Sequence, residues 1–237
     1  MVTASSFAYE ADLCRTLTRE LLSKMASDEI RVVRHLQVAT EIPDYVLVHS
    51  GEAQSVAPRL SSMECAVLAQ LHWGETARDA IADHLFSQPW RIEAALTRLV
   101  RLGLATVVGT AYASATEVLR HARVIAIEAK LTRWADALDQ ARSYRRFANA
   151  SYVALPLDVL RRRREHFRRD CETAQIGLLG VAPDSCCIDV PAPHHNPLTI
   201  DWVLTVMRSL AANVSEKRRI AGTQSTSCVD GSGLFAR

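Results

Sequence analysis

The chain has 237 residues, of which 49% are hydrophobic and 23% are charged, as is typical of globular proteins with one or two domains. The formal net charge of +2 excludes a protein that coats polyanions through its overall charge, so any nucleic-acid contact must come from local basic clusters. Only three of the 28 basic residues are lysines, namely Lys24, Lys130 and Lys217. Arginine is therefore the default cation of this chain, and each lysine is a departure from it.

Cysteine usage and the N-terminus predict a reduced, cytoplasmic protein. The six cysteines follow no paired spacing, and residues 1–13 lack a basic segment followed by an apolar stretch, which a secretory signal would have. No apolar run approaches the roughly 20 residues needed to span a bilayer, so we expect no membrane role. Residues 223–237 are rich in Gly, Ser and Thr and are expected to be disordered.

The first 50 residues predict one helix and two strands. Residues 8–25 repeat apolar side chains at near-helical spacing with polar residues between them, which predicts an amphipathic helix. Two β-rich segments, residues 29–38 and 42–48, follow with only three residues between them and predict an antiparallel pair. Asp44 comes directly after Pro43 at the start of the second strand, and Pro-Asp is by itself an ordinary pair for a turn or strand start.

Residues 61–113 have a different pattern of three helices and a pair of short strands. We expect the helices at residues 61–73, 74–86 and 87–104 and the strands at residues 105–114. Ser87 is the expected N-cap of the third helix, Pro89 lies in its first turn and Gly103 ends it. The strands alternate around Gly109, as in a β-hairpin. This order resembles the winged helix-turn-helix family over about fifty residues.

The winged-helix resemblance implies DNA contacts from the third helix, where such proteins place the side chains that contact bases. Arg91, Arg98 and Arg101 lie on this helix. Glu93 and the adjacent apolar residues fit packing or dimerisation equally well. A homodimer or a protein partner is therefore the other expectation for this segment.

After residue 121, strands alternate with helices, which predicts an α/β sheet covered by helices. The expected strands are residues 123–131, 151–156 and 176–182, and the expected helices are residues 134–150, 158–174 and 199–219. The second of these helices carries the run RRRREHFRR at residues 161–169, which fits either a solvated helix face or a phosphate-binding surface.

Residues 186–195 bring two cysteines and two histidines together, namely Cys186, Cys187, His194 and His195. Structural zinc sites usually space their ligands by two to four residues, and adjacent residues seldom reach one metal ion together. We therefore favour a proline-rich loop over a zinc site here.

Glu128 and Lys130 lie two positions apart in the strand expected at residues 123–131, so their side chains point to the same face. A salt bridge on an edge strand is the ordinary interpretation. However, residues 124–127 form an apolar run typical of a strand covered on both faces, where a charge is costly without partners. Arginine would usually supply a surface cation in this chain, whereas a compact ammonium group can lie beside a water or a phosphate. We therefore expect a specific role for this pair.

Five features follow one another in the chain: a helix with an acid, a strand, a Pro-Asp strand, a Glu-x-Lys strand, and a helix with Gln140 and Tyr144 at i and i+4. Together they resemble the PD-(D/E)xK nuclease superfamily, including the Gln-x-x-x-Tyr helix of its RecB-like branch. The resemblance implies an α/β fold, a restriction-endonuclease-like mixed sheet flanked by helices. Its core would comprise residues 1–55 and 114–185, with residues 60–113 as an inserted winged-helix domain and residues 186–222 as a loop and C-terminal helix. An insertion is tolerable if the two strands around it are antiparallel neighbours.

Carried over residue by residue, the resemblance makes Asp44 and Glu128 the metal-binding carboxylates and Lys130 the catalytic lysine. Glu20 would be the helical acid that touches the metal directly or through water, and Glu10 on the same helix is the alternative. The implied cofactor is Mg²⁺ or Mn²⁺.

The same resemblance assigns nucleic-acid contacts to the helix after the Glu-x-Lys strand. Gln140 and Tyr144 would orient the site and meet the nucleic-acid backbone. Arg142 and Arg145 lie next to them and are expected to bind nucleic acid, together with Arg91 of the winged-helix segment and its neighbour Arg98.

The implied chemistry follows from charge. Two carboxylates can hold Mg²⁺ where it polarises a phosphate and lowers the pKa of a bound water, and Lys130 would stabilise the pentavalent state or orient that water. We therefore expect hydrolysis of phosphodiester bonds, most simply in DNA, without a covalent intermediate. The alternative is a noncatalytic DNA-binding regulator in which the winged helix contacts DNA and the α/β domain serves as a scaffold.

Overall fold

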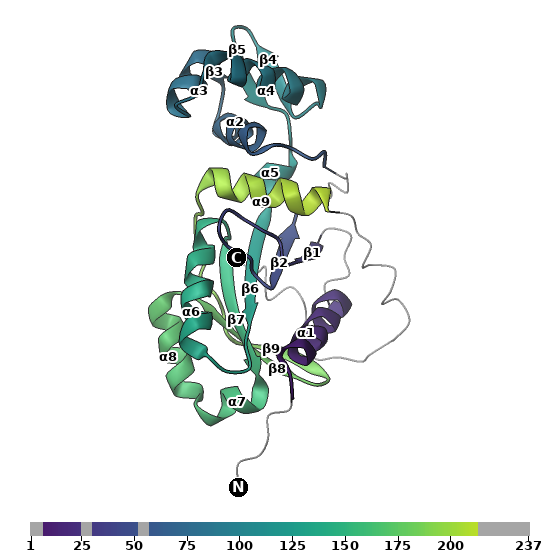
Figure 1. Ribbon diagram of the computed structural model, residues 1–237, viewed down its shortest axis with the longest axis vertical. Coiled ribbons are helices and arrows are strands. Elements are labelled where there is room, and N and C mark those ends of the chain that lie inside the picture. The colour runs from purple at the N-terminus through teal and green to yellow at the C-terminus, as the bar shows by residue number, and fades with distance from the viewer. Residues whose placement is uncertain (1–6, 25–29, 52–56, 213–237) are drawn as a thin grey trace.

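The computed structural model describes residues 7–24, 30–51 and 57–212. Its strands form one six-stranded sheet and one three-stranded sheet. Figure 1 shows an elongated molecule, with the large sheet and its helices below and the small sheet with its helices above. The fold class is mixed α/β, as the alternation of strands and helices predicted.

The large sheet has the strand order β1-β2-β6-β7-β8-β9. Neighbouring strands are antiparallel from β1 to β6, parallel from β6 to β8, and antiparallel again between β8 and β9. Strand β6 therefore has an antiparallel neighbour on one side and a parallel neighbour on the other. The strands are β1 (Ile30–Arg34), β2 (Tyr45–His49), β6 (Arg123–Ala129), β7 (Ala150–Pro156), β8 (Gly177–Ala182) and β9 (Ser185–Val190).

Helices cover both faces of the large sheet, because its central strands are apolar on both sides. Along β2, Tyr45 and Leu47 pack with Leu13 and Leu17 of helix α1 (Glu10–Lys24), whereas Val46 lies in the core on the opposite face. That opposite face is covered by α6 (Trp134–Ser143), the 3-10 turn η1 (Tyr144–Arg146), α8 (Arg164–Ala174) and α9 (Thr199–Ala211). The predicted cover of helices is confirmed.

The elements between β2 and β6 form a small unit above the large sheet, and the chain leaves and rejoins the sheet at one point. The chain departs after His49 of β2 and returns at Arg123 of β6, and these two residues are direct register partners. The elements between them are α2 (Ser62–His72), β3 (Thr76–Ala77), α3 (Arg78–His84), α4 (Pro89–Arg101), β4 (Ala105–Val108), β5 (Ala111–Ser114) and α5 (Val118–His121). Helix α2 packs on α9, and one apolar core runs from α2 and α4 through α9 to the sheet.

Two local expectations for the small unit were wrong. Residues 74–77 do not begin a helix, because Thr76 pairs with Tyr112 in the small sheet and α3 begins only after that pairing. Gln88 rather than Ser87 is the N-cap of α4, because the helix begins at Pro89 itself, the first helical position that proline favours. The helix end near Gly103 and the hairpin turn at Gly109 are confirmed, and both glycines have positive φ, of 70° and 60°.

The arginine-rich segment forms two helices rather than one. Arg163, with φ −134° and ψ 33°, separates α7 (Leu157–Arg162) from α8. Leu160 of α7 lies against Gly180 of β8, while Phe167 of α8 is buried in the same apolar cluster further along the chain. The break lets α7 cover the end of the sheet and α8 return along its face.

Residues 185–190 form the edge strand β9, where a loop was expected. A turn at Pro183 and Asp184 joins it to β8 in an antiparallel hairpin. The strand was missed because an edge position leaves most of its residues half-buried, so its apolar pattern is weak. The end of the last expected helix and the tail from residue 223 lie outside the described residues. Among the described helices, none combines the length and apolar character needed to cross a bilayer.

Asn149 is a buried connection between the large sheet and its covering helix α9. Its Oδ1 accepts hydrogen bonds from the Val124 N–H at 2.8 Å and from Trp202 Nε1 at 3.1 Å. Its backbone carbonyl accepts from the His195 N–H at 2.7 Å. One side chain therefore satisfies donors from β6 and from α9.

Replacing Asn149 with alanine should lower the free energy of unfolding by about 2–4 kcal/mol, because two buried donors lose their acceptor. Urea denaturation followed by circular dichroism measures this. The exposed Asn196 supplies the control, since Asn196→Ala should change stability by less than about 0.5 kcal/mol. Equal effects of the two substitutions would contradict the role given to Asn149.

Candidate active site at the end of strand β6

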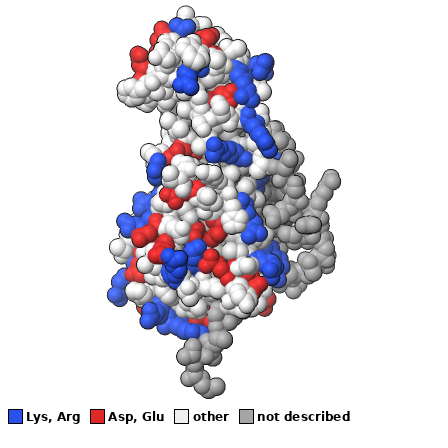
Figure 2. Space-filling view, viewed as in Figure 1, with Lys and Arg blue, Asp and Glu red and all other residues white. Residues whose placement is uncertain are grey.

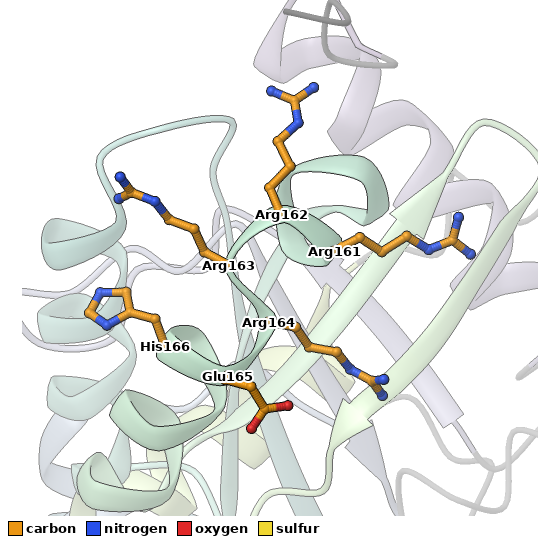
Figure 3. Close-up of a pocket in the computed structure, with 6 residues that line it drawn as sticks. All are labelled: Arg161, Arg162, Arg163, Arg164, Glu165 and His166. Atoms are coloured by element: carbon orange, nitrogen blue, oxygen red, sulfur yellow. The ribbon is translucent and has the colours of Figure 1, made fainter.

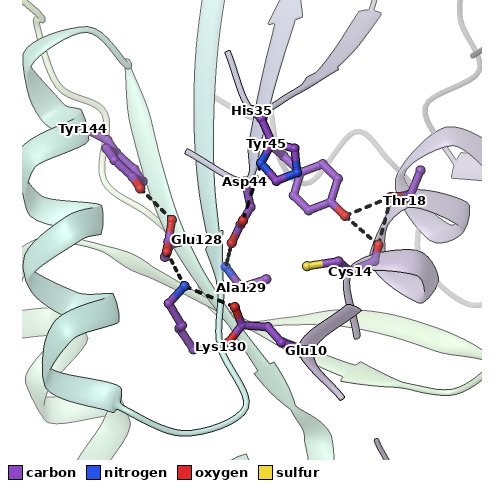
Figure 4. Close-up of polar contacts among 10 residues, drawn as sticks. All are labelled: Glu10, Cys14, Thr18, His35, Asp44, Tyr45, Glu128, Ala129, Lys130 and Tyr144. Atoms are coloured by element: carbon purple, nitrogen blue, oxygen red, sulfur yellow. Dashed lines mark hydrogen bonds and ion pairs between the residues drawn. The ribbon is translucent and has the colours of Figure 1, made fainter. Parts of the chain in front are cut away.

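Asp44 and Glu128 come together because β2 and β6 are antiparallel neighbours. The register pairs Tyr45 with Ile127, so one further step along the same ladder sets Asp44 opposite Glu128. Directly opposed residues have Cβ atoms about 5 Å apart. Oδ2 of Asp44 also accepts a hydrogen bond of 2.8 Å from the Ala129 N–H, which fixes this carboxylate to the end of β6 (Figure 4).

Glu128 is buried and both of its carboxylate oxygens are bonded. Only 2% of the residue is exposed. Lys130 Nζ lies 2.7 Å from Oε1, and the Tyr144 hydroxyl donates to Oε2 at 2.5 Å. Burial raises the pKa of Glu128, and the hydrogen bonds from Lys130 and Tyr144 oppose that rise without cancelling it. The carboxylate thus depends on its two donors to remain charged.

Lys130 sits among acidic groups just past the end of β6. Besides Glu128, its Nζ lies 3.3 Å from Oε1 of Glu10, the first residue of α1. Burial alone would lower the pKa of Lys130, but the hydrogen bond and charge of Glu128, together with the charges of Asp44 and Glu10, raise it above its ordinary value. The neighbouring acids therefore stabilise the ammonium form of Lys130, which is paired with both Glu128 and Glu10.

Tyr144 holds Glu128 from the helical layer. The α-helix ends at Ser143 and tightens into the 3-10 turn that begins with Tyr144. The ring is buried next to Phe147, with the two centroids 5.6 Å apart. Burial first, and then the hydrogen bond and charge of Glu128, raise the pKa of the phenol, so its hydroxyl stays a donor. Tyr144 was expected to orient the site and to meet the nucleic-acid backbone. In the structure it is buried and its hydroxyl bonds Glu128, so it faces the interior of the protein and not a nucleic acid.

The structure brings Glu10, and not Glu20, to the site. Glu10 contacts Lys130 directly (Figure 4), whereas Glu20 lies ten residues further along α1, a rise of about 15 Å. There Glu20 is 3.3 Å from Nε of Arg19, whose guanidinium also bonds the carbonyl of Pro183 in the β8–β9 turn. Of the two acids left open on this helix, Glu10 is the one adjacent to the lysine.

His35 is a site residue that the sequence analysis missed. Its Nδ1 lies 4.0 Å from Oδ1 of Asp44, and its N–H donates to the Asp44 carbonyl at 3.2 Å. Its position follows from the register of the β1–β2 hairpin, which pairs Arg34 with Tyr45. The next residue pair along the hairpin is therefore His35 and Asp44. Predicting this required the register, which the two β-rich segments alone do not fix.

Of the residues near α6 that were expected to contact nucleic acid, Gln140 and Arg142 are exposed, whereas Arg145 bonds within the protein. Gln140 is exposed and precedes Tyr144 by about one helical turn, a spacing that sets the two residues on neighbouring parts of the helix surface. Arg142 is also exposed, 3.9 Å from Asp139. Arg145 instead donates to the carbonyl of Ala174 at 3.4 Å, so it ties η1 to the end of α8.

On helix α4, Arg98 has a structural role. Its Nη1 lies 2.8 Å and 3.0 Å from the two carboxylate oxygens of Glu64 in α2, and Nη2 donates to the carbonyl of Arg59 at 3.1 Å. Arg91 is exposed, with its guanidinium 5.7 Å from the centre of the Trp90 ring. Of the two arginines expected to contact nucleic acid from this helix, Arg91 faces solvent and Arg98 is held by Glu64.

The acids of the site offer carboxylate oxygens, the ligand type that Mg²⁺ takes. Mg²⁺ is held by one or two carboxylates and keeps several waters, and Asp44 with Glu128 supply such a pair. Among the described residues, no group of three or more His, Cys, Asp or Glu side chains is arranged to hold a metal ion, as a structural zinc site would require. Cys186 and Cys187 are free thiols on successive positions of β9, so their side chains point to opposite faces.

Replacing Lys130 with methionine should destabilise the protein by about 3 kcal/mol at neutral pH, because Glu128 would be left as an unpaired buried charge. Without the lysine, burial holds the folded-state pKa of Glu128 further above its ordinary value of 4.5. A carboxyl with a raised folded pKa loses stability as the pH rises above the unfolded pKa. Urea denaturation should therefore show a larger loss at about pH 8 than at about pH 5.

The double variant Glu128→Gln/Lys130→Met provides the control, because it removes both charges. Its stability should depend less on pH than that of Lys130→Met alone. Equal losses for the single variant at both pH values would show that Glu128 does not depend on Lys130 for its charge.

Comparison of this chain with protein-family models, with curated proteins and with solved structures finds no match. The geometry and chemistry of the site at the end of β6 therefore carry the functional assignment.

Proposed function

We propose that this chain is a metal-dependent nuclease that hydrolyses phosphodiester bonds, with DNA as its substrate. The observation that carries the proposal is the meeting of Asp44, Glu128 and Lys130 at one end of β6, although Asp44 comes from a distant part of the chain. Two acids can hold a metal ion that assists phosphodiester hydrolysis, and an ammonium group beside them can stabilise the negative charge that develops on the phosphate. If Glu128 and Lys130 formed only a structural salt bridge, neither Asp44 nor the partly exposed Glu10 would be needed beside them.

The connectivity of the large sheet supports a restriction-endonuclease-like fold. Helix α1 is followed by the antiparallel strands β1, β2 and β6, then by α6 and by β7 parallel to β6. This is the order of helix, strand, Pro-Asp strand, Glu-x-Lys strand and helix on which the sequence resemblance depends. The interruption between β2 and β6 falls where the two strands are direct neighbours, which makes an insertion inexpensive.

The order of elements in the insertion supports a winged-helix unit. Three helices and a short strand are completed by the β4–β5 hairpin in a three-stranded sheet. Helix α4 would be the recognition helix, with Arg91 and Arg101 exposed on it and Arg98 retained by Glu64. We propose that this unit selects the substrate, while the chemistry takes place at β6.

Each side chain of the site has a distinct role in the proposed reaction. A Mg²⁺ ion held by Asp44 and Glu128 would polarise the phosphate and lower the pKa of a bound water. The Ala129 N–H fixes Asp44, and the Tyr144 hydroxyl fixes Glu128, so neither carboxylate has to reorganise when substrate binds. Lys130 remains charged and can exchange its weaker contact with Glu10 for a phosphate oxygen, where it would stabilise the negative charge of the transition state.

Asp44→Asn and Lys130→Met should each reduce cleavage of labelled DNA in Mg²⁺ by at least about 100-fold, because each removes charge from the site. The assay should include single- and double-stranded DNA and RNA, and chelation with EDTA should stop the reaction. Glu117→Gln serves as the matched control, since this exposed acid is the N-cap residue of α5, near the opposite end of β6.

Unchanged cleavage in all three variants would remove the proposed site. Tight DNA binding by the wild-type protein without any cleavage in Mg²⁺ or Mn²⁺ would favour the regulator, in which the insertion alone contacts DNA.

A further inference from the structure

A second basic surface lies at the same end of the large sheet as the candidate active site. Strands β6 and β7 are parallel, so their C-terminal ends meet at one edge. Glu128 and Lys130 mark that end of β6, and α7 follows directly after Pro156 at that end of β7. In Figure 1, α7 lies at the lower end of the molecule, where Figure 2 shows Lys and Arg side chains gathered on the surface.

The distance from the site to this surface follows from backbone connections. The Lys130 N–H donates to the carbonyl of Ala154, and Arg161 lies seven residues further on, across the last part of β7 and most of α7. At about 3.3 Å per residue in a strand and 1.5 Å in a helix, Arg161 is at most roughly 20 Å from Lys130. A nucleic-acid strand with one phosphate per about 3.4 Å of helix axis spans that distance within roughly six nucleotides.

Two arginines of the α7–α8 junction, Arg161 and Arg163, differ from their neighbours in their ion pairing. Arg162 pairs with Asp158 and Arg164 pairs with Asp189. Within the part of the chain that the structure describes, Arg161 and Arg163 make no ion pair, although both are exposed. Charges left unpaired beside paired ones are available to an external anion.

The junction is firmly seated even though its cations face solvent. Leu160 before the break and Phe167 after it are both buried, and the Arg164 guanidinium lies 2.6 Å from the nearly buried Asp189 of β9. The arginines therefore extend from a fixed backbone and not from a long loop, which lowers the entropic cost of binding.

The directions of the side chains favour an extended ligand over a compact one. A surface hollow of about 540 Å³ is lined by the six residues Arg161 to His166. Figure 3 shows that these side chains spread outward from the junction, with Arg161 and Arg163 pointing to opposite sides. A single phosphate ion would need guanidinium groups that converge, whereas a chain of phosphates can contact successive groups that diverge.

We propose, on the basis of the nuclease function above, that the α7–α8 junction binds the phosphate backbone of the nucleic-acid strand outside the cleaved bond. Arg161 and Arg163 neutralise phosphates a few nucleotides from the one held at Lys130. This surface raises affinity without reading sequence, because contacts to phosphates carry no base information.

The test is the affinity of the full-length protein for fluorescein-labelled 20-nucleotide DNA, single- and double-stranded, measured by fluorescence anisotropy in EDTA. The absence of metal separates binding from cleavage. Arg161→Gln/Arg163→Gln should weaken binding roughly 10- to 50-fold at about 0.1 M salt and reduce the slope of log affinity against log salt by about 1.4–1.8. Arg120→Gln/Arg123→Gln, with the same change in charge at the opposite end of β6, should leave affinity within about twofold.

Equal losses in the two double variants, or unchanged affinity in both, would overturn the proposal. So would unchanged DNA affinity together with lost sedimentation on anionic phospholipid vesicles, which would make the surface a membrane contact. If the Arg161/Arg163 variant alone weakens binding while the wild-type protein cleaves no substrate, the junction binds nucleic acid and the nuclease assignment fails. If the wild-type protein cleaves DNA but the substitution of these arginines does not change its affinity, the nuclease assignment stands and the phosphate-binding role of the junction fails.

Discussion

The buried carboxylate of Glu128 is the constraint on which the arrangement of the site depends. A charge that is 2% exposed is tolerated only if donors reach both of its oxygens, and those donors come from two directions, Lys130 from the end of the same strand and Tyr144 from the helical layer. The strand and the 3-10 turn must therefore both be in place before Glu128 is satisfied, and α1 adds Glu10 beside Lys130. The same burial that makes the carboxylate costly would strengthen its attraction for a divalent ion.

Sheet topology explains why the functional groups gather at one edge. Strand β6 pairs antiparallel with β2 and parallel with β7, so its C-terminal end adjoins the start of β2, which supplies Asp44, and the end of β7, which leads to the α7–α8 junction. The opposite end of β6 adjoins the point where the small unit is attached. The proposed metal ligands and the proposed phosphate contacts thus lie at one end of the strand, and the small unit is attached at the other.

The sequence predicted the elements of this arrangement better than their details. The apolar run of residues 124–127 and the Glu-x-Lys spacing were sufficient to locate β6 and its charged face. His35 and the choice of Glu10 over Glu20 could not be predicted, because they depend on strand register and on how far α1 overlaps the sheet. Strand β9 was missed because an edge strand has a weak apolar pattern, and the break at Arg163 arises from packing on two parts of the sheet, which local propensity does not encode.

The scarcity of lysine allows a direct test of the central claim, that Asp44 and Glu128 hold one divalent cation close to Lys130. The chain has three lysines, so ¹⁵N-lysine labelling gives three ammonium signals in an NMR spectrum. Substoichiometric Mn²⁺ should broaden the Lys130 signal, assigned with Lys130→Met, well before the other two, and Asp44→Asn should abolish that selectivity. Equal broadening of all three signals, or selective broadening that persists in Asp44→Asn, would contradict a metal site at the end of β6.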